Sequence, residues 1–264
     1  MHKDIIKFND LIKEKRNNLY LVLTNDIDSL ISCNFLMKNY GIPIGGFYDF
    51  KEWRKSSTVV YGERNIPFFV DGDISYPYYC VGNHPRLTKN SNCFNLNQNI
   101  GERNYTKKIA CSTFYVLLWL NNMKAYNKMT FKQKELLLML DSFYMQYFKF
   151  NNIWNIWNKY CKTEDLTDIV KLRTYDEWKE LSIELGLYKP IYLKNNSLVL
   201  GFDIDYINNQ FDIKITTPDI VFDKSMLQLD IVECKATNDI IEKDIFSGAR
   251  IYKNSFRYSR YQKT

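Results

Sequence analysis

Apolar and polar residues alternate along the N-terminal part of the chain in a way that predicts helices and strands in succession. Residues 2–16 carry apolar side chains at helical spacing, and the continuous apolar run 19–24 is typical of a parallel strand covered on both faces. A helical segment follows and ends at Gly41, because glycine commonly closes helices. Further short strands are predicted at residues 42–50, 57–62, 66–73 and 78–85.

The pattern becomes helical between about residues 104 and 185, with long apolar helices predicted at 111–123 and 131–148. Strand patterns return afterwards, at residues 190–194, 197–204, 211–216, 219–222 and 227–236. We therefore expect an α/β protein with a mainly parallel sheet and flanking helices. The predicted domains are residues 1–185, which include the helical middle region, and a smaller mixed α+β domain at 186–264.

Composition adds only weak restrictions. The 264 residues are 45% hydrophobic and 16% aromatic, which suffices for a packed core, and the net charge is +6. A positive charge permits a nucleic-acid partner, but the many Lys, Asn, Ile and Tyr residues are also typical of AT-rich genomes, such as those of low-GC bacteria and their phages. The longest apolar runs are about half of what a membrane-spanning helix needs, so we expect a cytoplasmic protein without a membrane partner.

Cysteine and histidine content bears on metal chemistry. The six cysteines form no C-x-x-C pair, and scattered thiols of this kind are typical of a reducing compartment. His2 and His84 are the only histidines, which excludes a His-rich zinc site.

Polar residues follow three of the predicted strands at the points where the strands end. Asp26 and Asp28 follow the first apolar run, Asp71 follows the strand at 66–70, and Asn83 and His84 follow the strand at 78–82. Ligands of open α/β sheets bind beyond the carboxyl ends of the strands, where these side chains would converge. Two carboxylates about 4 Å apart repel by roughly 4 kcal/mol at an effective dielectric of 20, so protons, Lys or Arg side chains, or metal cations must offset the repulsion. Basic residues are scarce within these motifs, and oxygen donors with one imidazole suit Mn²⁺ or Mg²⁺. A single such acid would more often be a helix cap, but three strand ends in a row favour a site.

These motifs, in this order, resemble the DHH phosphoesterase superfamily over about residues 17–145. The resemblance implies a Mn²⁺-dependent (or Mg²⁺-dependent) phosphoesterase with two ions, or one, and with Asp71 as the bridging ligand. It also implies that Asn83 and His84 are catalytic, with Asn83 near the scissile phosphate. The remaining implied ligands are Asp26 for one ion, and Asp28, His84 and, on a later helix, Asp141 for the other.

The sequence departs from the family pattern at two points. Gly82 stands where the family has the first acid of its Asp-His-His motif, and no histidine precedes Asp26. The chain is therefore either a divergent enzyme or a catalytically impaired relative that binds a phosphorylated ligand or a partner protein.

Basic and aromatic residues alternate near the C-terminus, a combination that suits phosphates and bases. We expect Arg250, Lys253 and Arg257 to bind substrate, which would be a nucleotide, a cyclic dinucleotide or a short oligonucleotide. The bond that is hydrolysed could be a phosphodiester or a phosphoanhydride. The sequence also permits a homodimer.

A second motif near the C-terminus favours a different function. Pro218 and Asp219, followed by Glu233 and Lys235, resemble the PD-(D/E)-x-K nuclease motif. On a strand, Glu233 and Lys235 would share one face. The motif is short and few residues follow it, so we favour an edge hairpin with a surface ion pair as its explanation.

Overall fold

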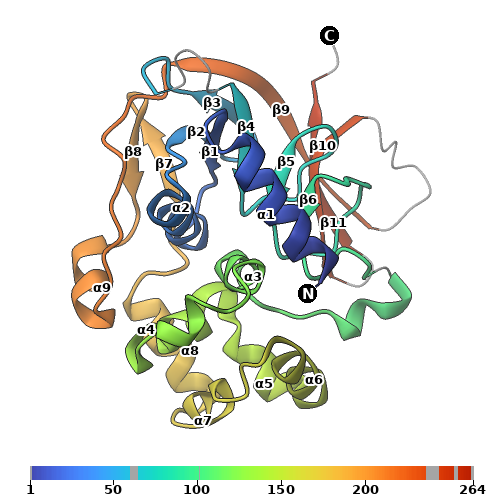
Figure 1. Cartoon of the computed structure of the whole chain (residues 1–264), viewed down its shortest axis with the longest axis vertical. Helices are drawn as coiled ribbons and strands as arrows, with labels where there is room; N and C mark the ends of the chain where they lie inside the picture. Colours follow the sequence, from blue (N-terminus) through green and yellow to red (C-terminus); the bar gives the residue numbers. More distant parts are fainter. Residues whose placement is uncertain (1, 60–64, 101, 236–243, 253–254, 263–264) are drawn as a thin grey trace.

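The computed structural model describes the chain except residues 1, 60–64, 101, 236–243, 253–254 and 263–264 (Figure 1). Its described residues form a nine-stranded sheet and a separate two-stranded hairpin. The strands of the large sheet are β1 (Leu19–Leu23), β2 (Ile44–Tyr48), β3 (Glu52–Lys55), β4 (Ile66–Val70), β5 (Tyr79–Val81), β6 (Cys93–Phe94), β9 (Lys224–Lys235), β10 (Ile245–Tyr252) and β11 (Ser255–Tyr261). The hairpin consists of β7 (Ile191–Lys194) and β8 (Ser197–Leu200).

The large sheet is mixed, in the order β10-β11-β9-β3-β2-β1-β4-β5-β6. Strands β2, β1, β4, β5 and β6 pair in parallel, as predicted. The pairings that lead from β2 through β3, β9 and β11 to β10 are all antiparallel, so the expectation of a mainly parallel sheet is correct only for one half. Strand β3 follows β2 after a turn of three residues, and a connection this short forces antiparallel pairing.

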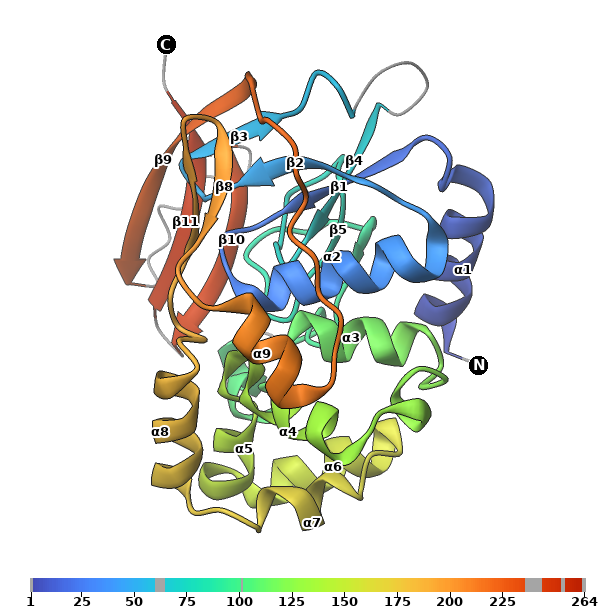
Figure 2. The same cartoon turned by 90° about the vertical axis from the view of Figure 1, so that its left-hand side faces the viewer.

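Helices cover the sheet and form a second group below it. They are α1 (Lys3–Lys15), α2 (Ile27–Tyr40), α3 (Thr113–Leu120), α4 (Phe131–Met139), α5 (Tyr144–Lys149), α6 (Asn151–Cys161), α7 (Leu166–Val170), α8 (Tyr175–Glu184) and α9 (Ile204–Phe211). Short 3₁₀ helices span Glu102–Lys107, Tyr126–Lys128 and Leu140–Ser142. Helices α4 to α7 lie on the side of α3 that faces away from the strands (Figure 2).

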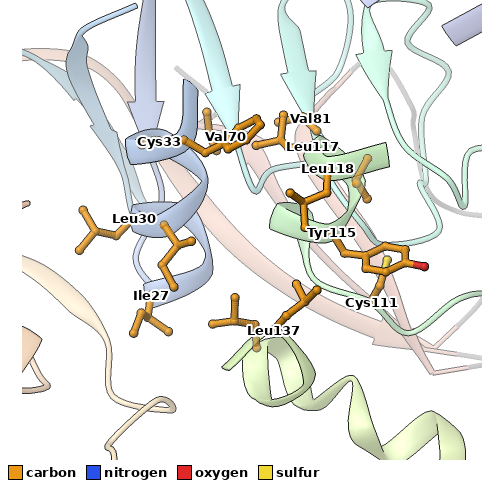
Figure 3. Packing of buried hydrophobic residues seen from close by; sticks show 14 of the residues in the cluster. Ile27, Leu30, Cys33, Val70, Val81, Cys111, Tyr115, Leu117, Leu118 and Leu137 are labelled. Carbon is orange, nitrogen blue, oxygen red and sulfur yellow. The ribbon is translucent and has the colours of Figure 1, made fainter. Parts of the chain in front are cut away.

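Helix α2 anchors the core beneath the parallel strands. Its residues Ile27, Leu30 and Cys33 are buried, and Cys33 points toward Val70 of β4 (Figure 3). Val70 of β4 and Leu137 of α4 belong to the same buried cluster. Burying a side chain of this size contributes roughly 1.5–3 kcal/mol, so the position of α2 relative to β1 and β4 is well determined.

The carboxyl ends of three parallel strands are level with one another. Leu23 of β1 pairs with Val70 of β4, and Val70 pairs with Val81 of β5. The residues that follow these strands therefore emerge at the same edge of the sheet, as the sequence predicted.

Several predicted elements differ from the observed ones. The strand predicted at 57–62 is wrong where the structure describes it, since residues 57–59 form a turn and 60–62 lie outside the described residues. The predicted helix 131–148 is interrupted, because Asp141 and Ser142 adopt left-handed backbone angles, with φ of 50° and 55°. The end of the predicted strand 197–204 is helical instead, since Asp203 caps α9 and its carboxylate accepts the amide hydrogen of Tyr206.

The predicted C-terminal domain, residues 186–264, shares the large sheet with the N-terminal strands. Strand β9 pairs along its first part with β3 and along its second part with β11. The sheet thereby curls, and β10 and β11 come to lie beyond the carboxyl ends of β4 and β5 (Figures 1 and 2). A separate domain at 186–264 stays a prediction.

Gly41 closes α2 as the sequence predicted, and it offers a test of this fold. Its φ is 70° and a Cβ atom there would meet nothing within 4 Å, so a substitution is opposed by backbone strain alone. We expect Gly41→Ala to lower the free energy of unfolding in urea by about 1 kcal/mol. Gly41→Asn should lose less unfolding free energy than Gly41→Ala, because asparagine tolerates the left-handed conformation better than alanine does. Equal stability of Gly41→Ala and the wild type would contradict the assigned helix end.

Candidate metal centre

Asp26 lies where β1 passes into α2. As the N-cap of α2 it accepts the amide hydrogen of Ser29 at 2.9 Å. The hydroxyl of Ser29 donates to the carbonyl oxygen of Val70 and accepts the amide hydrogen of Thr24, at 3.0 and 2.8 Å. These bonds fix the start of α2 to the ends of both β1 and β4, and the sequence places Asp26 at that junction because aspartate is a strong helix cap.

Asp28 links the N-termini of two helices. Its carboxylate, which is 1% exposed, accepts amide hydrogens from Thr113 at 2.6 Å and Phe114 at 3.0 Å, both in the first turn of α3. Helix N-termini carry partial positive charge, so α3 stabilises the negative form of this buried carboxylate.

Asp71 and Asp141 both reach the cluster through unusual backbone conformations. Asp71 follows β4 with φ of 61°, and its carboxylate accepts a hydrogen bond from the Thr113 hydroxyl at 2.7 Å. Asp141 lies in the break between α4 and α5, with φ of 50°, and accepts a hydrogen bond from the side-chain amide of Asn83. Aspartate adopts this left-handed region more readily than most residues.

Three of these carboxylates form a compact group. One oxygen each from Asp28, Asp71 and Asp141 lie within 4.8 Å of one another, a spacing compatible with a shared cation. Asp26 and His84 stand outside this group but line the same cavity as Asp71 and Asp141. The structure therefore gathers all five predicted metal ligands at one edge of the sheet, with three of them in mutual reach.

Desolvation and mutual repulsion make three of the acids, Asp26, Asp28 and Asp141, reluctant to ionise. Desolvation, followed by the negative charges of the neighbouring acids, raises the pKa values of Asp26 and Asp28 well above their ordinary value. The same two causes raise the pKa of Asp141 to about 7, although the hydrogen bond from Asn83 and the charge of Lys108 act in the opposite direction. Carboxylates with these properties bind protons or cations strongly.

Compensating side-chain cations are scarce at this site. Among the described residues, no ion pair involves Asp26, Asp28, Asp71 or Asp141. The buried Oδ1 atom of Asn83, whose amide group faces Asp141, also has no hydrogen-bond partner there. Oxygen donors without a cation fit a hard divalent ion such as Mg²⁺ or Mn²⁺.

A cavity of about 450 Å³ opens beside the carboxylates. His84 lines it, and desolvation lowers the pKa of its imidazole, so the ring is neutral near pH 7 and able to donate a lone pair. Residues of β7, β11 and the turn after β2 also line this cavity, among them Arg257, Tyr258, Tyr192 and Phe50. Asp26 and Asp141 also line a second cavity, of about 340 Å³, together with Tyr188.

The three residues predicted to bind substrate have different locations. Arg257 lines the larger cavity and pairs with the exposed Glu233 at 3.3 Å. Arg250 is not among the lining residues of that cavity, and its guanidinium lies 4.3 Å from the centre of the Phe256 ring. Lys253 lies outside the described residues. Glu233, the acid of the nuclease-like motif, thus forms a surface ion pair, as the simpler interpretation of that motif expects. The edge position expected for its strand is wrong, because β9 lies between β11 and β3 in the sheet.

Sequence reasoning missed the side chains that hold the Asn83–His84 segment. Buried Asn95 and Asn97 donate to the carbonyl oxygens of His84 and Asn83, at 2.7 and 2.5 Å. Buried Asp73 accepts the His84 amide hydrogen at 3.3 Å. Two asparagines in alternation directly after a cysteine and a phenylalanine, in "CFNLNQN", are the signal that could have indicated them.

Comparisons with known proteins found no match for this chain. No protein-family model, no curated protein and no solved structure matches it. Among the described residues, no helix combines the length and apolar character that crossing a bilayer requires.

The raised pKa values predict a pH-dependent stability of the metal-free protein. An unfolded aspartate releases its proton near pH 3.8, whereas Asp73 and Asp141 in the folded chain hold theirs until about pH 7. The folded state therefore binds more protons in this interval, and the free energy of unfolding should fall as pH rises from about 5 to 8. The lowered pKa of His84 acts in the opposite direction, but only below its ordinary value of 6.5.

Melting temperatures in EDTA across this interval measure the effect, and added Mn²⁺ should restore the lost stability most strongly at the alkaline end. A metal-free protein whose melting temperature rises steadily through pH 7 would contradict these protonation states.

Asp26→Asn separates the capping role of Asp26 from its charge. Asparagine caps helices as well as aspartate does, while the substitution removes one of the repelling charges. We expect a metal-free variant that is about 1 kcal/mol more stable at pH 8 in urea unfolding, with a smaller rise in melting temperature on addition of Mn²⁺. Asp203→Asn, at the exposed N-cap of α9, is the matched control and should change neither quantity. Equal behaviour of the two variants would show that Asp26 is only a cap.

Proposed function

We propose that this protein is a divalent-metal-dependent phosphoesterase, in agreement with the resemblance of its motifs to the DHH superfamily. One observation carries the proposal: three carboxylates, from Asp28, Asp71 and Asp141, lie within 4.8 Å of one another at the carboxyl edge of the parallel strands. Desolvation and like charge at this edge are offset by no ion pair among the described residues.

The residues present fit one ion and leave room for a second. The three carboxylates would hold the first ion, and Asp26 and Asp71 would contribute to the second, with Mn²⁺ or Mg²⁺ as the expected metal. A bound divalent ion supplies Lewis acidity and stabilises the charge that develops on a phosphoryl group. The neutral imidazole of His84 lies at the same cavity, where it can ligate metal or exchange a proton with substrate.

Basic and aromatic residues that line the same cavity support a nucleotide or short oligonucleotide as the substrate. Arg257 provides a cation for a phosphate, while Tyr258, Tyr192 and Phe50 provide aromatic surface for a base. A cavity of about 450 Å³ is in the range of small-molecule sites. A cyclic dinucleotide is compatible with the same chemistry.

Asp71→Asn tests the proposal, because this substitution removes a charge from the centre of the group without changing its shape. Hydrolysis of bis-p-nitrophenyl phosphate by the wild type should require Mn²⁺ or Mg²⁺. The variant should retain less than about one hundredth of the turnover. Metal-dependent turnover at the wild-type rate in Asp71→Asn would contradict the proposal.

Glu233→Gln is the matched control and tests the rival nuclease function. We expect its turnover number to stay near that of the wild type, because Glu233 is exposed and does not line the cavity. Loss of its ion pair with Arg257 should change KM alone. Loss of cleavage in Glu233→Gln but not in Asp71→Asn would assign the activity to the nuclease-like motif. Binding of nucleotides without turnover in any metal would favour the catalytically impaired alternative.

A further inference from the structure

The backbone of Asn83 and His84 is held from several sides by buried side chains. Asp73 accepts the amide hydrogen of His84 at 3.3 Å, and Asn95 donates to the His84 carbonyl oxygen at 2.7 Å. Asn97 donates to the Asn83 carbonyl oxygen at 2.5 Å. Asp73, Asn95 and Asn97 are 6%, 1% and 0% exposed, so water does not compete for these bonds. The peptide that carries the imidazole therefore depends on a network that includes one acid.

Asp73 and Asn95 are also bonded to each other. The side-chain amide of Asn95 donates to Asp73 Oδ1 at 2.6 Å, a short bond of the kind that carboxylates form. The carbonyl oxygen of Asp73 accepts the amide hydrogen of Gly248 at 3.1 Å, which joins this network to β10. Asp73 is thus fixed on both its side chain and its main chain.

The carboxylate of Asp73 occupies the space directly in front of residue 82. A Cβ atom built on Gly82 would lie 2.7 Å from Asp73 Oδ1 and 2.9 Å from both Cγ and Oδ2. Gly82 has no left-handed φ, so its backbone conformation would accept any residue. What excludes a side chain at position 82 is therefore the carboxylate of Asp73 and not the fold of the chain.

Position 82 is where the resemblance to the DHH superfamily places an acid that this sequence lacks. The structure has a buried carboxylate at that place, although it comes from the segment after β4 and not from the segment after β5. Glycine at position 82 and aspartate at position 73 are complementary, because a side chain at position 82 would clash with the carboxylate of Asp73.

We propose that Asp73 is a positioning residue for His84, and that it supplies from position 73 the carboxylate that residue 82 would otherwise provide. Its effect on turnover rests on the proposed function. Its effect on the orientation of the imidazole and on stability does not.

A reciprocal exchange tests the proposal with four proteins: wild type, Asp73→Gly, Gly82→Asp and the double variant. Asp73→Gly leaves two buried donors without an acceptor, and Gly82→Asp places two carboxylates in one space, so both single variants should be less stable in urea. In the double variant, the aspartate introduced at position 82 supplies the carboxylate that Asp73 supplied before. Its loss of unfolding free energy should therefore be smaller than the sum of the losses in the two single variants.

The orientation of His84 has a direct spectroscopic readout, since the chain contains only His2 and His84. In ¹H–¹³C NMR spectra, Asp73→Gly should shift the imidazole signal of His84 and leave that of His2 unchanged. The double variant should return the His84 signal toward its wild-type position. Gly41→Ala, destabilised far from the network, is the control and should move neither signal. If Asp73→Gly does not fold, Asp73→Asn keeps the shape of the side chain and should produce the same shift in a smaller degree.

Turnover gives the second readout. Asp73→Gly should lower kcat about 10- to 100-fold with little change in KM, and the double variant should recover most of it. An unmoved His84 signal in a folded Asp73 variant, or strictly additive losses in the double variant, would overturn the proposal. A wild type without metal-dependent hydrolysis would refute the proposed function alone, and the NMR and unfolding measurements would still decide the role of Asp73.

Discussion

Repulsion among closely spaced carboxylates at one edge of the sheet is the constraint on which the site depends. The parallel strands β1 and β4 end at the same level, so that Asp26 and Asp71, which follow them, lie at the same edge of the sheet. Asp28 lies in the first turn of α2 and accepts an amide hydrogen from the first turn of α3. Each pair of like charges about 4 Å apart opposes folding by roughly 4 kcal/mol at an effective dielectric of 20. Hydrophobic packing of α2 and α3 beneath the strands holds the acids together despite this repulsion (Figure 3).

The protein reduces this repulsion in part through its own hydrogen bonds. Backbone amides at the starts of α2 and α3 satisfy Asp26 and Asp28, and the Thr113 hydroxyl and the Asn83 amide satisfy Asp71 and Asp141. These donors orient the carboxylates but carry no full positive charge, and the pKa values of Asp26, Asp28 and Asp141 stay raised. A divalent cation has the positive charge and the preference for oxygen ligands that would balance the remaining negative charge of these carboxylates.

The sequence allowed prediction of those parts of the site that depend on local pattern. The apolar run before Asp26, the strand before Asp71 and the helix end at Gly41 each follow from neighbouring residues, and all three are observed. Asp141 was predicted only as a helical residue. Its left-handed φ and its hydrogen bond with Asn83, 58 positions away, are not encoded in the local pattern. Strand β3 contains a single buried residue, Trp53, so its apolar signal was too weak to detect.

Contacts between distant segments were beyond the reach of sequence patterns. The pairing of β9 with β3 joins residues more than 160 positions apart, as in the pair Trp53 and Leu227. The network of Asp73 and Asn95 likewise depends on strands that only the folded sheet brings together. Whether a cation balances these carboxylates can be seen by anomalous diffraction from a crystal soaked in millimolar Mn²⁺. We expect a manganese peak within ligand distance of Asp28, Asp71 and Asp141. Well-ordered carboxylates without such a peak would show that these acids hold no cation.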